Sequence, residues 1–348
     1  MKIEIQPFFN PEVKKEQGSK FFNLGKSLEN IISKISSSLL EKPVAPPEDR
    51  SKNPLYKALP PLQDTVKRLL DLEPKTREFI SVPFRESLAA NWIPTEDNFF
   101  EDQGVQLAEK AFESFCNKEP GVSLIPPIVH FIWMGSEPPK TVELAMASWK
   151  KHNPSFEVKL WTDAEIQKFS WSCPHSEMFF KTAKNWAEKS DILRFEILYQ
   201  LGGIYCDTDA VCLNSFENLL NRGMSFFAGF ESNKIKRFGR PLIGSALIGA
   251  APRSSVIKRC IDFSQTMEEA PAIHQHIRSG PGPITKASYE ALESGEKNVL
   301  LLPCSYLYPL PWEKRLASVE EIINNILPET FAIHLWEGSW FDSYHPPK

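Results

Sequence analysis

Three features that mark particular classes of protein are missing from this 348-residue sequence. Its six cysteines include no CxxC pair, so neither a zinc site nor a disulfide scaffold is indicated and reduced thiols are expected. No apolar run is long enough to span a bilayer, and the first residues lack the apolar segment of a secretory signal. We therefore expect a protein without a transmembrane segment, cytoplasmic in the cell that produces it.

An excess of charge of one sign is missing as well. The formal net charge is −4, so neither nucleic acid nor an anionic membrane is expected as the main partner. The hydrophobic content of 42% is that of a globular protein rather than a disordered one. The length allows one large domain, or a large and a small one.

The N-terminal part of the chain has a helical pattern. Apolar side chains recur at helical spacing in residues 26–42, and two further amphipathic helices are expected at residues 62–72 and 105–115. Residues 43–54 are rich in proline and charge, which indicates a linker.

From residue 125 onward, short β-type runs alternate with helical segments, the pattern of a layered α/β domain. Helices are expected at residues 141–152 and 176–199, and strands at residues 126–135, 156–163, 204–206, 226–230, 242–250, 299–302 and 331–336. The chain is therefore predicted to consist of a helical N-terminal region, residues 1–120, and an α/β domain, residues 121–348.

A pair of aspartates ends one of these strands. In LGGIYCDTDA, residues 201–210, Asp207 and Asp209 follow the apolar run directly. Aspartate is depleted in strands, and two like charges on one face repel each other. At the carboxyl end of a strand in an open α/β sheet, such a pair can hold Mg²⁺ or Mn²⁺ together with water and phosphate oxygens. By itself a DxD is a weak signal, because most instances are solvated turns.

A second charged pair precedes this strand. Asp191 and Arg194 are three residues apart, hence on one face of a helix whose other positions are mostly apolar. Charges on a largely buried helix need partners. A purely structural ion pair is the alternative to a role in ligand binding.

Four segments in this order resemble the glycosyltransferases that carry a DXD sugar-binding region: IVHFIWMG, SWKKHNPSFEVKLWTD, SDILRFEILYQLGGIYCDTDA and AIHLWEGSW. This family includes initiating α-1,6-mannosyltransferases, bacterial capsule-type sugar transferases and, distantly, the catalytic domain of the large clostridial glucosylating toxins. The resemblance covers about residues 125–340. It implies a GT-A fold, with a mixed nucleotide-sugar-binding sheet flanked by helices, and metal-dependent transfer that retains the anomeric configuration.

The resemblance also implies a donor-binding role for several residues. Trp133 resembles the residue that stacks on the nucleotide base, and a core tryptophan is the alternative. Asp191 and Arg194 resemble the pair that binds hydroxyls of the donor sugar. Tyr205 and Asp207 resemble contacts to the ribose and the sugar.

The C-terminal segment HLWEGSW would complete the site. Asp209 resembles the direct metal ligand, and we expect either His334 or Ser339 to add a further one; a buried, satisfied histidine is the alternative for His334. With Glu337, Ser339 and Trp340 resemble a terminal loop that closes over the diphosphate, Ser339 and the Trp340 indole N–H donating hydrogen bonds. The toxins have one residue between this serine and tryptophan, whereas here the two are adjacent.

Two weaker segments complete the pattern. Ser245 and Ala246 stand where the family commonly presents an asparagine to the donor sugar, so sugar preference is not indicated there. RSGPGPITKAS, residues 278–288, resembles the family's turn before a helix. A plain capping turn with Thr285 in the first helical turn is the alternative.

The predicted activity is metal-dependent, retaining transfer of a hexose from a nucleotide sugar, UDP-glucose or a similar UDP-hexose, to a protein or glycan acceptor. The leaving diphosphate can take the acceptor proton, so no separate pair of catalytic carboxylates is expected. The setting is either a bacterial effector delivered into a host cell or a cytosolic enzyme that builds a surface glycan. Lysines of the N-terminal helices also allow peripheral membrane contact, although such charges are usually only solvated.

Two other functions compete with this prediction. The first is a catalytically inactive GT-A module that binds a sugar or a protein, because fold does not settle function. The second is a Mg²⁺-dependent phosphatase or nucleotidyltransferase, which could also use a DxD. The Trp133 strand and the HLWEGSW tail fit the second poorly.

Overall fold

The computed structural model describes residues 62–73, 81–91, 99–183, 185–231, 236–237, 239–267 and 278–337. The helix expected at residues 26–42 and the linker expected at 43–54 lie outside these ranges.

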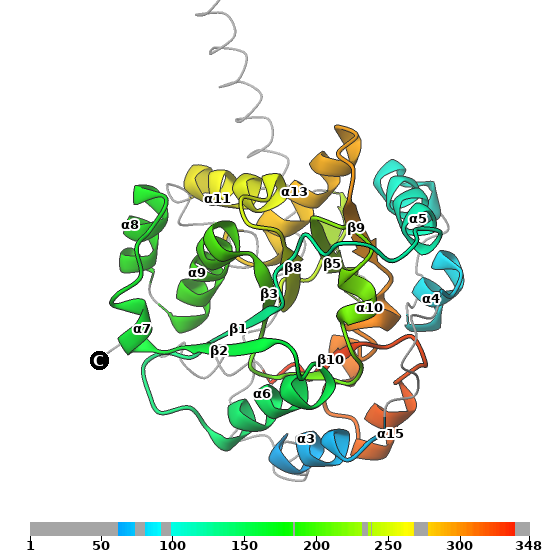
Figure 1. Ribbon diagram of the computed structural model, residues 1–348, viewed down its shortest axis with the longest axis horizontal. Coiled ribbons are helices and arrows are strands. Elements are labelled where there is room, and N and C mark those ends of the chain that lie inside the picture. The colour runs from blue at the N-terminus through cyan, green and yellow to red at the C-terminus, as the bar shows by residue number, and fades with distance from the viewer. Residues whose placement is uncertain are drawn as a thin grey trace, which may run out of the picture. The chain divides into compact units, whose positions relative to one another are not determined.

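A six-stranded mixed sheet forms the centre of the fold (Figure 1). Its order is β2-β1-β3-β8-β5-β9, with bounds Glu157–Trp161, Ile128–Ile132, Gly203–Cys206, Leu247–Ala250, Phe226–Gly229 and Val299–Leu302. Strand β1 pairs in parallel with β2 and β3, and β5 pairs in parallel with β9, whereas β8 runs antiparallel to both β3 and β5. All strands except β8 therefore end at the same edge of the sheet. The predicted class, a mixed α/β sheet flanked by helices, is confirmed.

Two smaller ladders accompany this sheet. Strand β4 (Ala210–Cys212) pairs antiparallel with β10 (Ala332–His334), and β6 (Lys236–Arg237) pairs antiparallel with β7 (Arg240–Pro241). In the first ladder His334 lies opposite Ala210. The register thus brings the C-terminal part of the chain beside the residues that follow β3.

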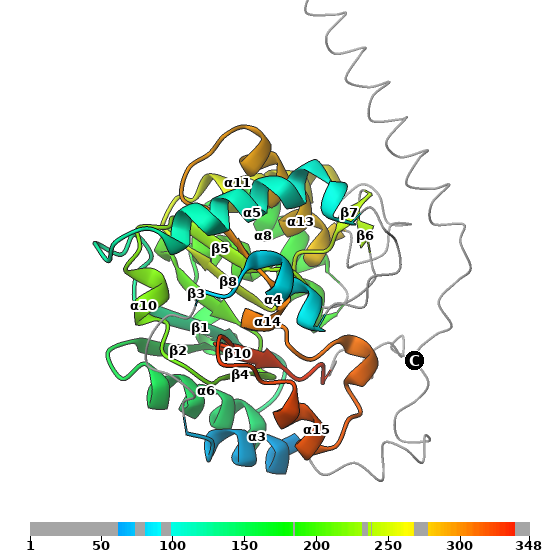
Figure 2. The same ribbon diagram turned by 90° about the vertical axis from the view of Figure 1, so that its right-hand side faces the viewer.

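Helices cover both faces of the six-stranded sheet (Figures 1 and 2). On one side lie α9 (Trp186–Leu201), α11 (Ser255–Met267) and α13 (Pro281–Glu293); on the other lie α6 (Lys140–His152) and α3 (Leu62–Leu70). The remaining helices are α4 (Phe84–Asn91), η2 (Phe99–Glu101), α5 (Gln103–Cys116), α7 (Asp163–Ile166), α8 (Pro174–Thr182), α10 (Glu217–Leu220), α14 (Cys304–Leu307), η3 (Trp312–Lys314) and α15 (Val319–Asn324).

The amphipathic helices expected at residues 62–72 and 105–115 are confirmed as α3 and α5. Helix α5 begins after Asp102, whose side chain accepts a hydrogen bond from the Val105 N–H at 3.1 Å, and it lies beside β9. Helix α3 lies against α6 with Val66 and Leu69 buried. The boundary near residue 120 stays a prediction.

The expected single helix at residues 176–199 is wrong. Two helices, α8 and α9, take its place, because Ala183 has an extended ψ of 135° and Asn185 starts a new helix. The Asn185 side chain accepts a hydrogen bond from the Glu188 N–H at 2.8 Å, which is a standard N-cap. The strand expected at 242–250 is also too long, since β8 begins only at Leu247 and Ile243 forms an isolated bridge with Phe230.

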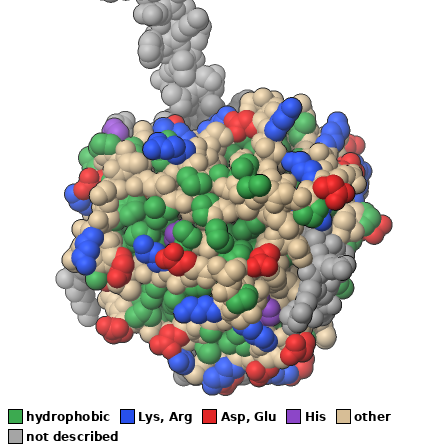
Figure 3. Space-filling view, in the orientation of Figure 1, with side chains coloured by type: hydrophobic (Ala, Val, Ile, Leu, Met, Phe, Trp, Pro, Cys, Tyr) green, Lys and Arg blue, Asp and Glu red, His purple; other side chains and the backbone are tan. Residues whose placement is uncertain are grey.

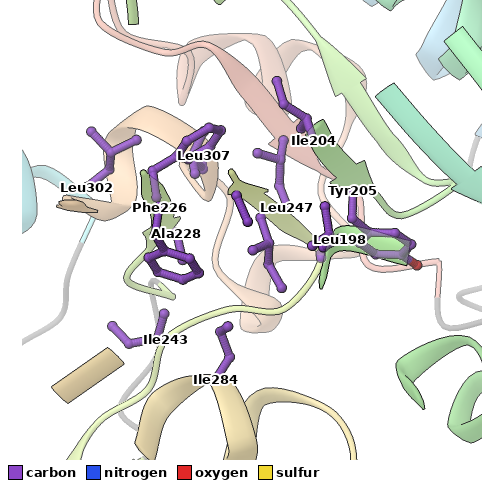
Figure 4. Close-up of a cluster of buried hydrophobic side chains, with 14 of the residues drawn as sticks. Leu198, Ile204, Tyr205, Phe226, Ala228, Ile243, Leu247, Ile284, Leu302 and Leu307 are labelled. Atoms are coloured by element: carbon purple, nitrogen blue, oxygen red, sulfur yellow. The ribbon is translucent and has the colours of Figure 1, made fainter. Parts of the chain in front are cut away.

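The core lies where the sheet meets the helices. Figure 4 shows side chains of strands and helices converging in one apolar cluster, which includes Leu198 of α9, Ile204 of β3, Leu247 of β8 and Ile284 of α13. Each of these side chains is fully buried. Their burial anchors α9 and α13 on the sheet, and these two helices carry residues of the site described below.

The surface shows no dominance of one charge on the face that Figure 3 presents, where acidic and basic side chains are interspersed. This agrees with the small net charge of the chain. Among the helices of the described residues, none is both long and apolar enough to cross a membrane.

A buried histidine of β1, His130, forms a hydrogen bond with Gly202, the residue before β3. The Nδ1 atom of His130 accepts a hydrogen bond from the Trp161 indole at 3.2 Å, so Nε2 carries the proton and donates to the Gly202 carbonyl at 2.9 Å. Gly203 has a φ of +98°, and a Cβ there would collide with the Ile128 carbonyl. Burial lowers the pKa of His130 to about 4.

The pKa of His130 predicts acid sensitivity. Between about pH 6.5 and 4 the unfolded chain binds a proton at His130 that the folded chain does not bind. The free energy of unfolding should therefore fall as the pH is lowered through this window, by about 2 to 3 kcal/mol from this group. Urea unfolding of the native chain and of His130→Gln at several pH values would measure the contribution.

The glutamine side chain has no such titration, so the pH profile of His130→Gln should be flatter. His175→Gln, a change at an exposed histidine, is the matched control. Equal slopes for the native chain and for His130→Gln would contradict the prediction.

Candidate functional site

The two aspartates of the DxD lie at the carboxyl end of β3, as predicted. The Asp207 N–H donates to the Ala246 carbonyl at 2.7 Å, and the Ala210 N–H donates to the Asp207 carbonyl at 3.0 Å. The chain therefore leaves β3, turns over residues 207–210 and enters β4. This turn holds Asp207 and Asp209 together at the edge where the parallel strands end, the usual place for ligands in open α/β sheets.

His334 joins the two aspartates. Its Nε2 lies 3.1 Å from Asp209 Oδ1 and 3.9 Å from Asp207 Oδ2. One possible ligand atom from each of the three residues lies within 4.8 Å of the others, a separation that allows them to share one ion. The Glu337 N–H donates to Asp209 Oδ2 at 2.7 Å and fixes that carboxylate from a second side. Two carboxylates and an imidazole form a donor set suited to a divalent cation.

The pKa shifts in this cluster reflect burial and the charges of neighbouring groups. Burial raises the pKa of Asp207, and Arg194 and His334 oppose this rise only in part. Burial also acts to raise the pKa of Asp209, but His334 and backbone hydrogen bonds, among them the one from Glu337, together outweigh it and the net shift is downward. Burial acts to lower the pKa of His334, and the two carboxylates reverse this shift, so its pKa is raised. His334 and the two carboxylates thus favour each other's charged forms, and a bound cation would favour the charged carboxylates in the same way.

Arg194 connects the helix α9 to the DxD. Its Nη2 lies 2.7 Å from Asp191 Oδ1 and 3.5 Å from Asp207 Oδ1, while Nη1 donates to the Ser245 carbonyl at 2.6 Å. The side chains of Arg194 and Asp191 are only 5% and 10% exposed. The predicted pair on one helix face is therefore real, and it reaches the first aspartate of the DxD.

Tyr205 orients Asp207 in this structure. Its hydroxyl donates to Asp207 Oδ1 at 2.6 Å and lies 3.1 Å from Ser190 Oγ. The guanidinium carbon of Arg194 lies 4.3 Å from the centre of the Tyr205 ring, a cation–π contact. The side chain is almost fully buried, and its hydroxyl is engaged within the protein.

Trp133 lies directly after β1, at the same edge of the sheet, and is half-buried rather than part of the core. Its indole N–H donates to Ser136 Oγ at 3.2 Å. The next loop is fixed by Asp163, whose Oδ2 accepts from the Gly135 N–H at 2.8 Å. A Cβ at Gly135 would collide with the ring of Trp186, which is 48% exposed.

The structure thus brings most of the predicted site residues to one edge of the sheet. Asp207, Asp209 and His334 form one cluster, and Asp191 and Arg194 adjoin it. Ser339 and Trp340 lie outside the described residues. The sequence alone did not predict the contacts made by Ser190, the Ser245 carbonyl and Trp186. Ser190 could have been singled out only because it is adjacent to Asp191 in the chain.

Parts of the chain are similar to known glycosyltransferases. Residues 139–225 match the family described as glycosyltransferase sugar-binding region containing DXD motif. Inositol phosphoceramide mannosyltransferase 3 of Schizosaccharomyces pombe is 33% identical over 98 residues, which are 28% of this chain and 28% of that protein. Lactosylceramide 4-alpha-galactosyltransferase of Mus musculus is 28% identical over 159 residues, 42% of this chain and 40% of that protein.

Among solved structures, the PaToxG glycosyltransferase aligns with a TM-score of 0.40 and 17% identity, covering 56% of this chain and 82% of that one. The galactosyltransferase LgtC, in complex with donor and acceptor sugar analogs, aligns with a TM-score of 0.38 and 11% identity, covering 61% and 88%. The chain spans less than half of the two curated relatives named above. The resemblance indicated by the sequence motifs is confirmed, and residues 139–225 are the part of the chain that the family model matches.

Proposed function

We propose that this protein is a metal-dependent, retaining glycosyltransferase of the GT-A type that transfers a hexose from a nucleotide sugar. The observation that carries the proposal is the meeting of Asp207, Asp209 and His334 beside the Asp191–Arg194 pair, at the carboxyl edge of a mixed sheet. We take a UDP-hexose, UDP-glucose or a close relative, as the donor.

The residues present fit a divalent metal, Mn²⁺ or Mg²⁺. Asp207, Asp209 and His334 would hold it. When bound, the cation supplies positive charge that stabilises the diphosphate as it leaves. The fit rests on the donor set, two carboxylates and an imidazole that can each place one ligand atom within 4.8 Å of the others.

The chain's own residues would bind and orient the donor. Asp191 accepts hydrogen bonds from sugar hydroxyls, since a carboxylate is an acceptor only. Arg194 holds Asp191 and Asp207 in fixed positions, and the Tyr205 hydroxyl donates to the same Oδ1 atom of Asp207 that Arg194 contacts. Trp133 offers an aromatic face to the base.

The C-terminal loop would close over the donor. Ser339 and Trp340 donate hydrogen bonds to the diphosphate, and Glu337 links the loop to the metal site through its backbone N–H. The leaving diphosphate takes the proton of the acceptor hydroxyl.

The acceptor is a protein or a glycan. The two relatives named above are called ceramide glycosyltransferases, so a glycolipid belongs in any acceptor screen. Modification of a host protein by a delivered bacterial effector is the more specific form of the proposal, and cytoplasmic synthesis of a surface glycan is the other. A catalytically inactive module is the alternative, and it would have no need of the cation that the Asp207, Asp209 and His334 cluster suits.

Cleavage of a nucleotide sugar should depend on the two aspartates of the DxD and on a divalent cation. The native chain should cleave one donor from a panel of UDP-glucose, UDP-galactose and GDP-mannose when Mn²⁺ is present, and chelation should stop the reaction. The double substitution Asp207→Asn, Asp209→Asn should lower the rate by at least about 100-fold, because it removes the charge that holds the cation. Hydrolysis would be followed by release of the nucleoside diphosphate.

Asp262→Asn is the matched control, because Asp262 is an exposed carboxylate of α11 that pairs with Lys258. It should leave the rate unchanged. If the native chain neither binds nor cleaves any of the three donors, the proposed activity is wrong and the catalytically inactive module becomes the favoured function.

Loss of the Arg194 guanidinium should lower the free energy of unfolding. Substitution by methionine keeps much of the volume but leaves the buried carboxylate of Asp191 and the half-buried carboxylate of Asp207 without their guanidinium partner. Loss of one partner from a buried ion pair costs about 3 to 5 kcal/mol of unfolding free energy. Urea unfolding at neutral pH would measure it.

Arg85→Met serves for comparison, since Arg85 pairs with Glu109 and is 55% exposed. An exposed pair of this kind contributes about 1 kcal/mol or less. A loss for Arg194→Met no larger than that for Arg85→Met would show that the pair does not stabilise the site.

A further inference from the structure

The turn before α13 lies against the candidate donor site. Ser279 is fully buried, and its hydroxyl donates to Asp191 Oδ2 at 2.9 Å. The next residue, Gly280, is also close, because a Cβ at this position would come within 3.2 Å of the same oxygen. This is the RSGPGPIT segment that the sequence pattern singled out, and neither the metal cluster nor the Arg194 contacts explain it.

Asp191 is consequently held from two sides. Arg194 contacts Oδ1 at 2.7 Å, and Ser279 contacts Oδ2. The orientation of this carboxylate is thus set by the protein before any ligand binds.

The turn itself is anchored on the same helix and on the sheet. Arg278 forms an ion pair with Glu188 of α9, whose side chain is 2% exposed. Thr285, the fifth residue of α13, accepts a hydrogen bond from the Ile243 N–H at 3.0 Å. The N-terminus of α13 meets the Asp191 carboxylate at Gly280, and its dipole favours a negative charge there.

A capping role does not account for the turn. The N-cap of α13 is Gly280, where no side-chain cap hydrogen bond forms, and Thr285 contacts Ile243 instead of the start of its own helix. The Ser279 hydroxyl bonds across to α9. The turn therefore joins two helices at the Asp191 carboxylate.

We propose that Ser279 is a positioning residue for the donor sugar: its hydroxyl fixes the Asp191 carboxylate in the orientation that receives the sugar hydroxyls. This inference rests on the proposed function, because it assigns the sugar, not the nucleotide, to Asp191. Loss of the Ser279 hydroxyl should then weaken binding of a nucleotide sugar without affecting the nucleoside diphosphate alone.

The test is calorimetric binding in the presence of Mn²⁺. The native chain and Ser279→Ala are titrated with UDP-glucose, UDP-galactose and GDP-mannose, and then with UDP and GDP. For the sugar nucleotide that the native chain binds, Ser279→Ala should lower the affinity about tenfold, the effect expected for one hydrogen bond to a charged group. The affinity for the matching diphosphate should stay the same.

Ser288→Ala is the matched control. Ser288 is also fully buried in α13, and its hydroxyl has no hydrogen-bond partner among the described residues. It should change neither affinity. Asp191→Asn should show the same selective loss as Ser279→Ala. Should Ser279→Ala fail to fold, Gly280→Ala, which keeps the hydroxyl but crowds the carboxylate, replaces it with the same expectation.

Two results would overturn the inference, and they differ in what else they affect. If the native chain binds a sugar nucleotide and Ser279→Ala behaves as Ser288→Ala does, or loses the diphosphate equally, the positioning role is wrong and the proposed function stands. If the native chain binds no sugar nucleotide while remaining folded, the proposed function is wrong and the inference falls with it.

Discussion

A single buried positive charge, the guanidinium of Arg194, organises the site. Burial of a charge is costly unless partners surround it, and Arg194 contacts the carboxylates of Asp191 and Asp207, the Ser245 carbonyl and the face of Tyr205. Each contact comes from a different segment: α9, the turn after β3, the loop before β8, and β3 itself. Satisfying this one charge therefore requires the segments to meet at one edge of the sheet.

The negative charge at this edge exceeds what Arg194 can balance. Asp209 has its own positive partner in His334, whose pKa is raised by the two carboxylates of the DxD. Two carboxylates and an imidazole that meet at one point also form a donor set suited to a divalent cation.

Helix α13 supports both halves of the site. The turn before it lies against Asp191, and Thr285 contacts Ile243, at the start of the loop that supplies the Ser245 and Ala246 carbonyls. The apolar side of the helix, including Ile284, is buried in the core shown in Figure 4. Because the core fixes α13, the orientation of polar groups in the site depends on apolar packing some distance away.

The sequence by itself determined much of the fold and part of the site. Alternation of β-type runs and helical segments predicted the α/β class, and it placed α3, α5, α6 and most strands correctly, because apolar periodicity reflects which face is buried. The break at Ala183–Asn185 was missed, because the apolar pattern continues through it and the N-cap at Asn185 is a local signal that this pattern hides. The Asp191–Arg194 pair and the DxD could be predicted from the sequence, since in each the two residues are close neighbours in the chain.

Only the tertiary structure decided which distant residues complete the site. His334 reaches Asp209 through the pairing of β10 with β4, and Ser279 reaches Asp191 through the turn before α13, a helix that packs on α11, which in turn packs on α9. Contacts of this kind depend on strand register and helix packing, which one sequence does not encode in any local pattern. The sequence therefore determined the residue types of the site. Burial of the apolar core and of the Arg194 charge decided that these residues lie together at one edge of the sheet.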